Sequence, residues 1–215
     1  MDVLIKAVIC FVIGYGCGNF STAWLIGKIK KVDFRKVGSG NLGTTNVMRT
    51  LGKKYGILTY VGDFIKVVVP VVLVEYVIFA DEDYNRLLGL VIGLGAVMGH
   101  VFPFWLKFKG GKGVAVMSAV MAVYNPWLLL IGWCLFWGIV LTTKYVSLGS
   151  MAAAVLFPIF VFVHDAIIDD NPYIISMMCI TLCYSVLVIY MHRANIQRIL
   201  NGTENKIGKK KEAHE

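Results

Sequence analysis

The chain has 215 residues, of which 58% are hydrophobic and only 16% are charged. About a quarter of the residues of a soluble domain are usually charged, so this composition excludes an ordinary soluble protein and indicates a membrane protein. The net charge of +8 raises the alternative of a nucleic-acid-binding protein. The positions of the charges along the chain, described below, argue against that class.

Seven apolar segments follow one another along the chain, and each is a candidate membrane-spanning helix. They lie near residues 3–26, 57–80, 87–106, 113–124, 126–142, 150–164 and 173–191. The fourth is short, and such a span is costly in lipid unless other parts of the protein cover it. The first lacks the basic flank and cleavage site of a signal peptide. We therefore expect an all-α polytopic membrane protein with a single domain over residues 1–215, ending in a tail over residues 193–215.

Most of the 21 lysines and arginines lie in loops that fall on one side of these spans, or in the tail. They are Lys28, Lys30, Lys31, Arg35, Lys36, Arg49, Lys53, Lys54, Lys107, Lys109, Lys112, Lys144, Arg193, Arg198, Lys206, Lys209, Lys210 and Lys211. The other side carries mainly the acidic residues Asp2, Asp81, Glu82, Asp83, Asp165, Asp169 and Asp170. The positive-inside rule then places the basic loops and the C-terminus in the cytoplasm and the N-terminus outside. Such a charge distribution indicates topology and contact with anionic lipids, not nucleic-acid binding.

Five cysteines lie within the apolar segments, and none forms a CxxC pair. A zinc site or a redox dithiol is therefore not expected. Buried structural cysteine is the favoured interpretation, and a thioester nucleophile is the alternative. The five are Cys10, Cys17, Cys134, Cys179 and Cys183.

The first polar motif runs from Val37 to Arg49 and combines three glycines with hydroxyl and amide side chains. Glycine lets backbone N–H groups approach an anion closely, and the neighbouring side chains add further donors. Arg49 can bind a phosphate through two hydrogen bonds. This stretch is a candidate phosphate-binding loop, and a solvated turn is the simpler alternative.

The second motif is Gly110-Gly111-Lys112-Gly113, which precedes an apolar helix. A helix N-terminus with glycine amides and a lysine is suited to bind phosphate, although the motif alone is a weak signal. It is not a nucleotide-binding P-loop, because Gly113 stands where that motif needs serine or threonine. Nucleoside triphosphate hydrolysis is therefore disfavoured. The nearby His100 lies in an apolar stretch, where a structural role is favoured over a catalytic one.

The third motif combines the stretch around Ser147 with His192 and Asn195, and Glu204 follows in the tail. His192 and Asn195 are three residues apart, so they share one face of a helix as the last span ends. A histidine there could be a general base, a donor to an oxyanion or an anchor at the membrane interface.

Together these stretches resemble one family, the acyl-phosphate:glycerol-3-phosphate acyltransferases of bacterial membranes (PlsY). The resemblance covers residues 39–49, 104–115, 144–150 and 192–205, in the same order and spacing. It implies transfer of a fatty acyl group from acyl phosphate to glycerol 3-phosphate, giving 1-acyl-glycerol 3-phosphate and inorganic phosphate, without a cofactor or metal. It also implies a location in the bacterial cell membrane with the active site facing the cytoplasm. The implied partners are the two substrates, membrane lipids and, as a candidate, the soluble enzyme that makes acyl phosphate.

The resemblance also assigns roles to residues. Ser39, Arg49, His192 and Asn195 are implied to be catalytic, and Glu204 is implied to be structural. The substrate-binding residues expected from the motifs and the resemblance are Asn41, Thr45, Asn46, Gly110, Gly111, Lys112, Gly113 and Ser147. Because acyl phosphate is already an activated anhydride, we expect direct attack by the substrate hydroxyl, with no covalent enzyme intermediate. Either His192 or a substrate phosphate could accept the proton.

Three other interpretations are weaker. A His-x4-Asp pair, as in many glycerol-phosphate acyltransferases, exists at His164 and Asp169, but we expect it on the outer face and therefore accidental. A transporter usually holds polar groups near the membrane midplane, and Asp63 and Lys66 could mark such a path, but they could also pair one turn apart. A magnesium-dependent phosphotransferase needs clustered carboxylates, whereas the cytoplasmic loops offer only the scattered Asp33 and Asp63.

Overall fold

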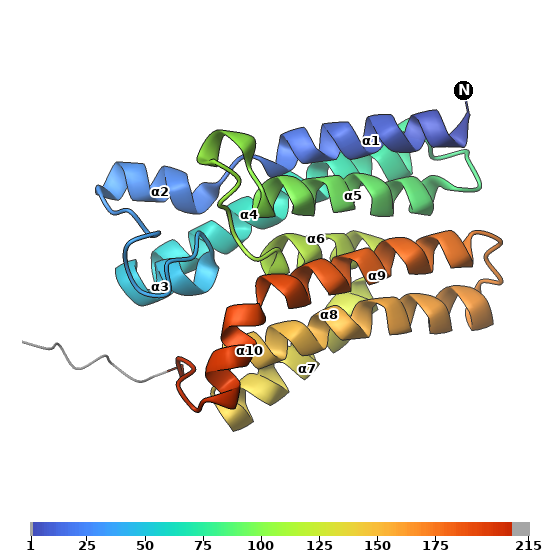
Figure 1. Ribbon diagram of the computed structural model, residues 1–215. Coiled ribbons are helices and arrows are strands. Elements are labelled where there is room, and N and C mark those ends of the chain that lie inside the picture. Colours follow the sequence, from blue (N-terminus) through green and yellow to red (C-terminus); the bar gives the residue numbers. More distant parts are fainter. Residues whose placement is uncertain (1, 208–215) are drawn as a thin grey trace, which may run out of the picture.

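The computed structural model describes residues 2–207, and this part of the chain is helical without any strand. Figure 1 shows the helices packed as a bundle. In chain order the α-helices are α1 (Val3–Gly18), α2 (Thr22–Lys30), α3 (Thr44–Leu51), α4 (Lys53–Leu73), α5 (Asn85–Val101), α6 (Val114–Tyr124), α7 (Pro126–Thr143), α8 (Val146–Val163), α9 (Ile174–Met191) and α10 (Arg193–Leu200). Single π-helical turns extend α4 (Val74–Ile78) and α8 (His164–Ile168), and Phe104–Leu106 forms a 3-10 turn.

Six helical segments are long and apolar enough to cross a membrane, so the expected all-α membrane fold is confirmed. Their outward faces are apolar, as lipid contact requires: Leu4, Val12 and Ile175 are each more than half exposed. The six are Val3–Lys30, Lys53–Ile78, Asn85–Leu106, Pro126–Thr143, Val146–Ile168 and Ile174–Met191. The remaining predicted span, the fourth, near residues 113–124, corresponds to α6, which has only 11 residues. A total of seven crossings therefore stays a prediction.

Helix α6 lies at the centre of the bundle, packed against α4, α5 and α7. Most of its residues are buried, as expected for a short apolar helix that neighbouring helices must cover. It is short because the segment before it folds back onto the end of α5. The amides of Gly110 and Gly111 donate to the carbonyls of Val101 and His100, at 3.0 and 3.1 Å. The 110–113 loop is thereby fixed against the end of α5.

Helices α1 and α5 approach each other through glycines on both partners. Gly14 and Gly18 on α1 face α5, and Gly95 and Gly99 on α5 face α1 in the same four-residue spacing. A Cβ atom at any of the four would overlap a backbone oxygen of the other helix. Small residues at this spacing let helix backbones pack closely in a membrane. The α1–α5 pair therefore depends on glycine itself.

We expect Gly18→Ala to destabilise the protein, because a methyl group there would overlap the backbone of Ala96 and force the two helices apart. Overpacking of this kind costs about 1–3 kcal/mol. Gly16→Ala is the matched control, since a Cβ atom on Gly16 of the same helix meets nothing within 4 Å. Thermal unfolding of the detergent-solubilised variants should show a lower Tm for Gly18→Ala alone. Equal Tm values would contradict the close approach of α1 and α5.

The polar segments gather at one end of the bundle, which we call the basic end. Figure 1 shows α2, α3 and α10 at this end, together with the connection between α5 and α6. The N-terminus and the α8–α9 connection lie at the opposite end. The fold therefore places the basic loops and the acidic loops at opposite ends of the bundle, as the sequence predicts. The lysines at positions 209–211 of the expected tail lie outside the described residues.

Candidate active site

A cavity of about 420 Å³ opens at the basic end, among α3, α4, α6, α7, α8 and α10. Its polar wall comes from the glycine-rich loops and from α10. Its other wall is apolar and aromatic, and includes Met117, Met121, Leu129, Trp133, Phe136 and Trp137. A cavity with these two walls suits an amphiphile that has an anionic head and a long apolar tail.

Asn46 organises the first glycine-rich loop. Its side-chain oxygen accepts the Ser39 amide at 2.8 Å, and its amide nitrogen donates to the backbone carbonyls of Phe34 and Asn41, each at 3.0 Å. Gly38 has a positive φ of 61°, and a Cβ atom there would overlap the Asn46 side chain. The side chain of Asn46 is thus occupied by the loop. Asn46 also lines the cavity, so its contact with substrate stays a prediction.

Ser39, Asn41, Thr45 and Arg49 all line the cavity, as the sequence predicts. The Arg49 guanidinium is exposed, and its Nη2 donates to the carbonyl of Asn205 at 3.4 Å. The backbone of the C-terminal segment thus lies beside the guanidinium, which stays on the rim of the cavity. No described residue forms an ion pair with Arg49 within 4 Å, which leaves its charge available to an anion.

Thr44, which the sequence analysis did not single out, is a further lining residue. Its hydroxyl is buried and has no hydrogen-bond partner among the described residues. It is the first residue of α3, whose N-cap Gly43 provides no side-chain cap. The Thr44 hydroxyl, which has no partner among the described residues, therefore lies at the N-terminus of α3 in the cavity wall.

The four residues of the second motif divide into two pairs. Lys112 and Gly113 line the cavity, but Gly110 and Gly111 are not among its lining residues. The Gly110 and Gly111 amides are already bonded to α5, and a Cβ atom on either residue would overlap His100. Glycine is needed at these two positions for close packing against α5. The expectation that they offer amides to a phosphate is thereby corrected, whereas Lys112 and the N-terminus of α6 remain candidates.

A chain of hydrogen bonds links the second and third motifs. The Lys112 ammonium donates to Asn195 Oδ1, and the amide nitrogen of Asn195 donates to Glu204 at 2.7 Å. Glu204 also accepts from Ser147 at 3.0 Å and from Arg198 at 2.8 Å. The carboxylate thus joins α8, α10 and the C-terminal segment, which supports the structural role expected for Glu204. Ser147 belongs to this chain of bonds and also lines the cavity, so its contact with substrate stays a prediction.

The charges of this network favour an anionic ligand. Burial, together with the nearby Arg198 and Arg49, lowers the pKa of Lys112 to about 8. Partial burial opposes ionisation of Glu204, but hydrogen bonds from Asn195, Arg198 and Ser147 still hold its pKa below the usual value. Three cations therefore share one carboxylate. A bound phosphate would offset the excess positive charge.

His192 lies at the junction of α9 and α10, only 3% exposed, and it borders the cavity. Its Nδ1 lies 2.8 Å from the carbonyl oxygen of Val188. A carbonyl only accepts, so Nδ1 carries the proton and Nε2 of the neutral ring is an acceptor. Burial and the nearby Lys112 lower the pKa of His192 to about 4, so the ring is neutral at physiological pH. The geometry fits a general base more closely than a cationic donor.

The comparisons with known proteins agree with this site. A family model described as glycerol-3-phosphate acyltransferase matches residues 8–202. The chain belongs to this family. A glycerol-3-phosphate acyltransferase of Geobacter sulfurreducens is 41% identical over 94% of this chain and 98% of its own length, and one from Clostridioides difficile is 42% identical over 95% and 97%.

Two solved structures are also similar, both of PlsY (YgiH), an integral membrane glycerol 3-phosphate acyltransferase. The glycerol 3-phosphate form has a TM-score of 0.83 and is 36% identical, with 94% of this chain and 96% of that chain covered. The lysophosphatidic acid form has a TM-score of 0.79 and is 35% identical, with coverage of 94% and 95%. Our chain is therefore an integral membrane acyltransferase of phospholipid synthesis, which argues against the transporter and phosphotransferase alternatives.

The cysteines of this acyltransferase lie away from the cavity: none of the five is among its lining residues in the described chain. Only Cys10 is buried, whereas Cys134, Cys179 and Cys183 are exposed on the outward faces of α7 and α9. The expectation that all five are buried in the protein was therefore wrong. An apolar helix in a membrane can place cysteine against lipid as well as against its neighbours. The positions give no support to a thioester intermediate.

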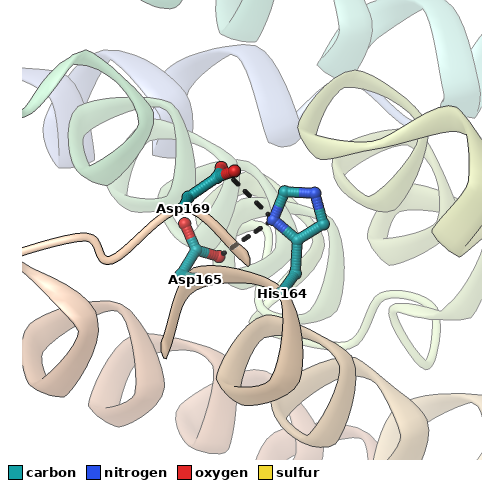
Figure 2. Close-up of side chains that lie close together, drawn as sticks. All are labelled: His164, Asp165 and Asp169. Atoms are coloured by element: carbon teal, nitrogen blue, oxygen red, sulfur yellow. Dashed lines mark ion pairs between the residues drawn. The ribbon is translucent and has the colours of Figure 1, made fainter. Parts of the chain in front are cut away.

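The His-x4-Asp pair does come together, at the end of the bundle opposite to the cavity. His164 Nδ1 lies 3.4 Å from Asp169 and 3.8 Å from Asp165 (Figure 2). The π-helical turn over His164–Ile168 brings the three side chains together. Because no described cavity-lining residue belongs to this cluster, the pair has no access to the acyltransferase site, as predicted.

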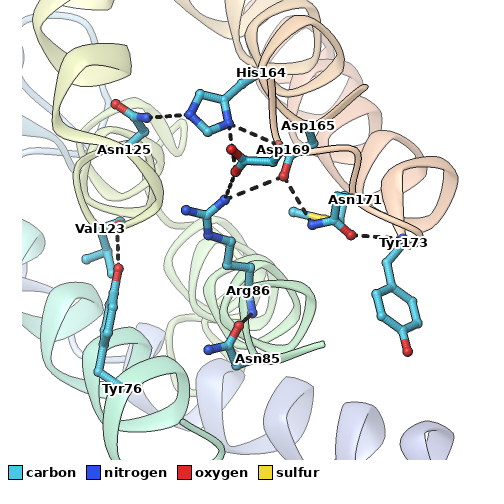
Figure 3. A network of polar contacts seen from close by, with 11 residues as sticks. Tyr76, Asn85, Arg86, Val123, Asn125, His164, Asp165, Asp169, Asn171 and Tyr173 are labelled. Carbon is cyan, nitrogen blue, oxygen red and sulfur yellow. Dashed lines mark hydrogen bonds and ion pairs between the residues drawn. The ribbon is translucent and has the colours of Figure 1, made fainter. Parts of the chain in front are cut away.

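Hydrogen bonds around this cluster favour a structural role over metal binding. Arg86 donates to Asp169 at 2.6 Å and lies 3.6 Å from Asp165, so a cation already faces the carboxylates (Figure 3). Asn125 uses its side-chain oxygen to cap α7 and turns its amide nitrogen to His164 Nε2, at 3.1 Å. Nε2 therefore accepts, and the proton lies on Nδ1, where a metal would need a lone pair. The cluster joins α5, α7 and α8 at this end of the bundle.

Proposed function

We propose that this acyltransferase uses acyl phosphate as the donor and glycerol 3-phosphate as the acceptor. The products are 1-acyl-glycerol 3-phosphate and inorganic phosphate. The observation that supports this most is that the cationic wall, with Lys112, and an apolar wall on α6 and α7 line the same cavity. The acyl chain would lie along the apolar wall, and the two phosphates would share the cationic wall.

In the proposed reaction the hydroxyl oxygen of glycerol 3-phosphate attacks the acyl carbonyl carbon. A new ester C–O bond forms, the C–O bond to the phosphate breaks, and the phosphate leaves with the bonding electron pair. Lys112, Arg49 and the N-terminus of α6 stabilise the charge on the carbonyl oxygen and on the leaving phosphate. In this proposal His192 Nε2 accepts the hydroxyl proton, and a substrate phosphate is the alternative acceptor. Ser39, Asn41, Thr45 and Asn195 complete the polar wall.

Purified protein tests the donor directly. Incubation with acyl phosphate and labelled glycerol 3-phosphate should give labelled lysophosphatidic acid and one inorganic phosphate for each molecule of product. Acyl-coenzyme A in place of acyl phosphate should support little turnover. Comparable turnover with acyl-coenzyme A, in the absence of acyl phosphate, would contradict the proposed donor.

We further propose that the enzyme lies in the bacterial cell membrane with the cavity facing the cytoplasm, where both substrates and a soluble acyl-phosphate-producing enzyme would meet it. The basic loops at the cavity end support this orientation. This orientation can be tested in a variant without the native cysteines, in which a single cysteine replaces either Asp83 or Lys53, both of which are exposed. A membrane-impermeant thiol reagent applied to intact cells should modify only position 83. Modification of position 53 alone would invert the orientation.

A further inference from the structure

A buried polar cluster that the assigned site does not include lies beneath the 110–113 loop. Asp63 and Lys66 on α4 form an ion pair of 2.9 Å, as the sequence allowed, and the Thr22 hydroxyl donates to Asp63 at 3.1 Å. Lys66 also lies 3.0 Å from Nδ1 of His100, at the end of α5. His100 is only 5% exposed, and it borders the cavity together with Asp63.

The position of Lys66 fixes the proton on the His100 ring. The ammonium group also donates to the carbonyl of Phe20 and forms the ion pair with Asp63. An ammonium has donors only, so His100 Nδ1 must accept from it. The neutral ring then carries its proton on Nε2. The Lys66–Asp63 pair thereby makes Nε2 a hydrogen-bond donor.

The Nε2 edge of the ring is directed toward the loops that form the polar wall. It lies against Gly111, where a Cβ atom would overlap Nε2 and would also lie 2.9 Å from the carbonyl oxygen of Leu42. Lys112 and Gly113, the next two residues, line the cavity. Among the described residues none accepts a hydrogen bond from Nε2. The ring is nearly buried, yet Nε2 is not among the fully buried polar atoms that lack a partner. The residue lines the cavity, where a ligand can accept the hydrogen bond from Nε2.

We propose that His100 is a further substrate-binding residue, whose Nε2–H donates to a phosphoryl oxygen held at Lys112 and the N-terminus of α6. The inference rests on the proposed function, because it needs a phosphate-bearing substrate in this cavity. Asp63 and Lys66 act through His100 as positioning residues. The arrangement also explains why residue 111 must be glycine: any side chain would displace the ring edge that donates.

Two substitutions of His100 distinguish the contributions of its two ring nitrogens to binding. In His100→Gln the side-chain amide can reach the Nε2 position and donate, whereas in His100→Asn it reaches only the Nδ1 position that faces Lys66. We expect His100→Asn to weaken phosphate binding about 10- to 100-fold, as for a lost bond to a charged group. His100→Gln should retain most of the affinity. His164→Gln, at the opposite end of the bundle, is the matched control.

Three constants identify the phosphate that is bound: the KM for glycerol 3-phosphate, the KM for acyl phosphate, and the inhibition constant of inorganic phosphate. The constant that is raised in His100→Asn but stays near its wild-type value in His100→Gln identifies the phosphate that His100 binds. Equal constants in the two variants and in the wild-type enzyme would overturn the proposal, and so would a loss that His100→Gln does not restore.

Nitrogen-15 NMR of histidine-labelled wild-type protein tests the inference without substitution or turnover. The His100 signals should show a protonated Nε2 and an unprotonated Nδ1, and Nε2 should shift when inorganic phosphate or glycerol 3-phosphate is added. A proton on Nδ1, or no shift at saturating phosphate, would refute the role of His100. Failure of the proposed function would look different, since the wild-type enzyme would then make no lysophosphatidic acid from acyl phosphate.

Discussion

Replacing Lys112 with methionine should lower kcat/KM for glycerol 3-phosphate roughly 100- to 1,000-fold, as expected when a donor to developing negative charge is lost. Lys112 is the one lysine among the described cavity-lining residues, and it lies next to the N-terminus of α6. Methionine retains most of the length and apolar volume of the side chain but neither its charge nor its donors. The bond to Asn195 would also be lost, so the polar wall would change in both charge and shape.

Lys109→Met is the control for Lys112→Met, because Lys109 belongs to the same loop but is exposed and does not line the cavity. It should leave kcat/KM nearly unchanged. Steady-state assays of both variants at saturating acyl phosphate make the comparison. Equal losses would show that the overall charge of the loop matters, and not a specific contact of Lys112.

The lowered pKa of Lys112 adds a pH dependence with a definite sign. Its value of about 8 in the free enzyme means that the ammonium form dominates below pH 8 and is lost as the pH rises above it. The wild-type kcat/KM should therefore fall on the alkaline side with a midpoint near pH 8. In Lys112→Arg this fall should disappear, because a guanidinium stays protonated. An alkaline fall that persists unchanged in the arginine variant would assign it to another group.

The sequence located the motifs of the site well but not the function of each glycine and amide within them. Lys112, Gly113 and Arg49 were predicted at the site and do line the cavity. Gly110 and Gly111 stand in the same motif, yet they pack against the end of α5. In a sequence, a glycine that packs against a ligand cannot be distinguished from a glycine that packs against its own chain. Only the fold shows which atom occupies the space.

A similar limit applies to the polar side chains. Asn46 and Ser147 were expected to bind substrate, and both line the cavity. The sequence did not show that Asn46 also holds its own loop and that Ser147 also donates to Glu204. The acceptor of Ser147 is far away in sequence and comes close only through the packing of α8 against the C-terminal segment. Thr44 and His100 were not predicted to line the cavity for the same reason, because their neighbours there are set by tertiary structure.

Hydropathy predicted the spans but not their internal breaks. The single apolar segment near residues 3–26 is divided into α1 and α2, because the Ser21 hydroxyl caps the new helix by accepting from Trp24 at 3.3 Å. Asn19, at the same break, accepts the backbone amide of Phe104 at 3.0 Å. Both residues are polar positions inside an otherwise apolar run. Hydropathy averaged over a window of this segment does not detect these two residues.

His192→Ala should lower kcat by roughly 100- to 10,000-fold if His192 accepts the hydroxyl proton. The ring is held as a neutral base, since its Nδ1 proton is bound to Val188 and its Nε2 is free to accept. KM for glycerol 3-phosphate should change much less than kcat, because the lost interaction develops as the proton moves. Gln197→Ala is the matched control: Gln197 is exposed on the adjoining helix α10 and does not line the cavity.

The pH dependence then separates His192 from a substrate phosphate as the base. With a pKa of about 4 in the folded enzyme, His192 stays in its basic form at every pH above that value. The ratio of wild-type to His192→Ala rates should therefore stay constant from about pH 5.5 to about pH 8, because substrate ionisation affects both enzymes equally. A ratio that falls below about pH 6.5 would indicate a histidine with an ordinary pKa. A ratio near one throughout, in a folded variant, would assign proton transfer to the substrate phosphate and leave His192 a role in shaping the cavity.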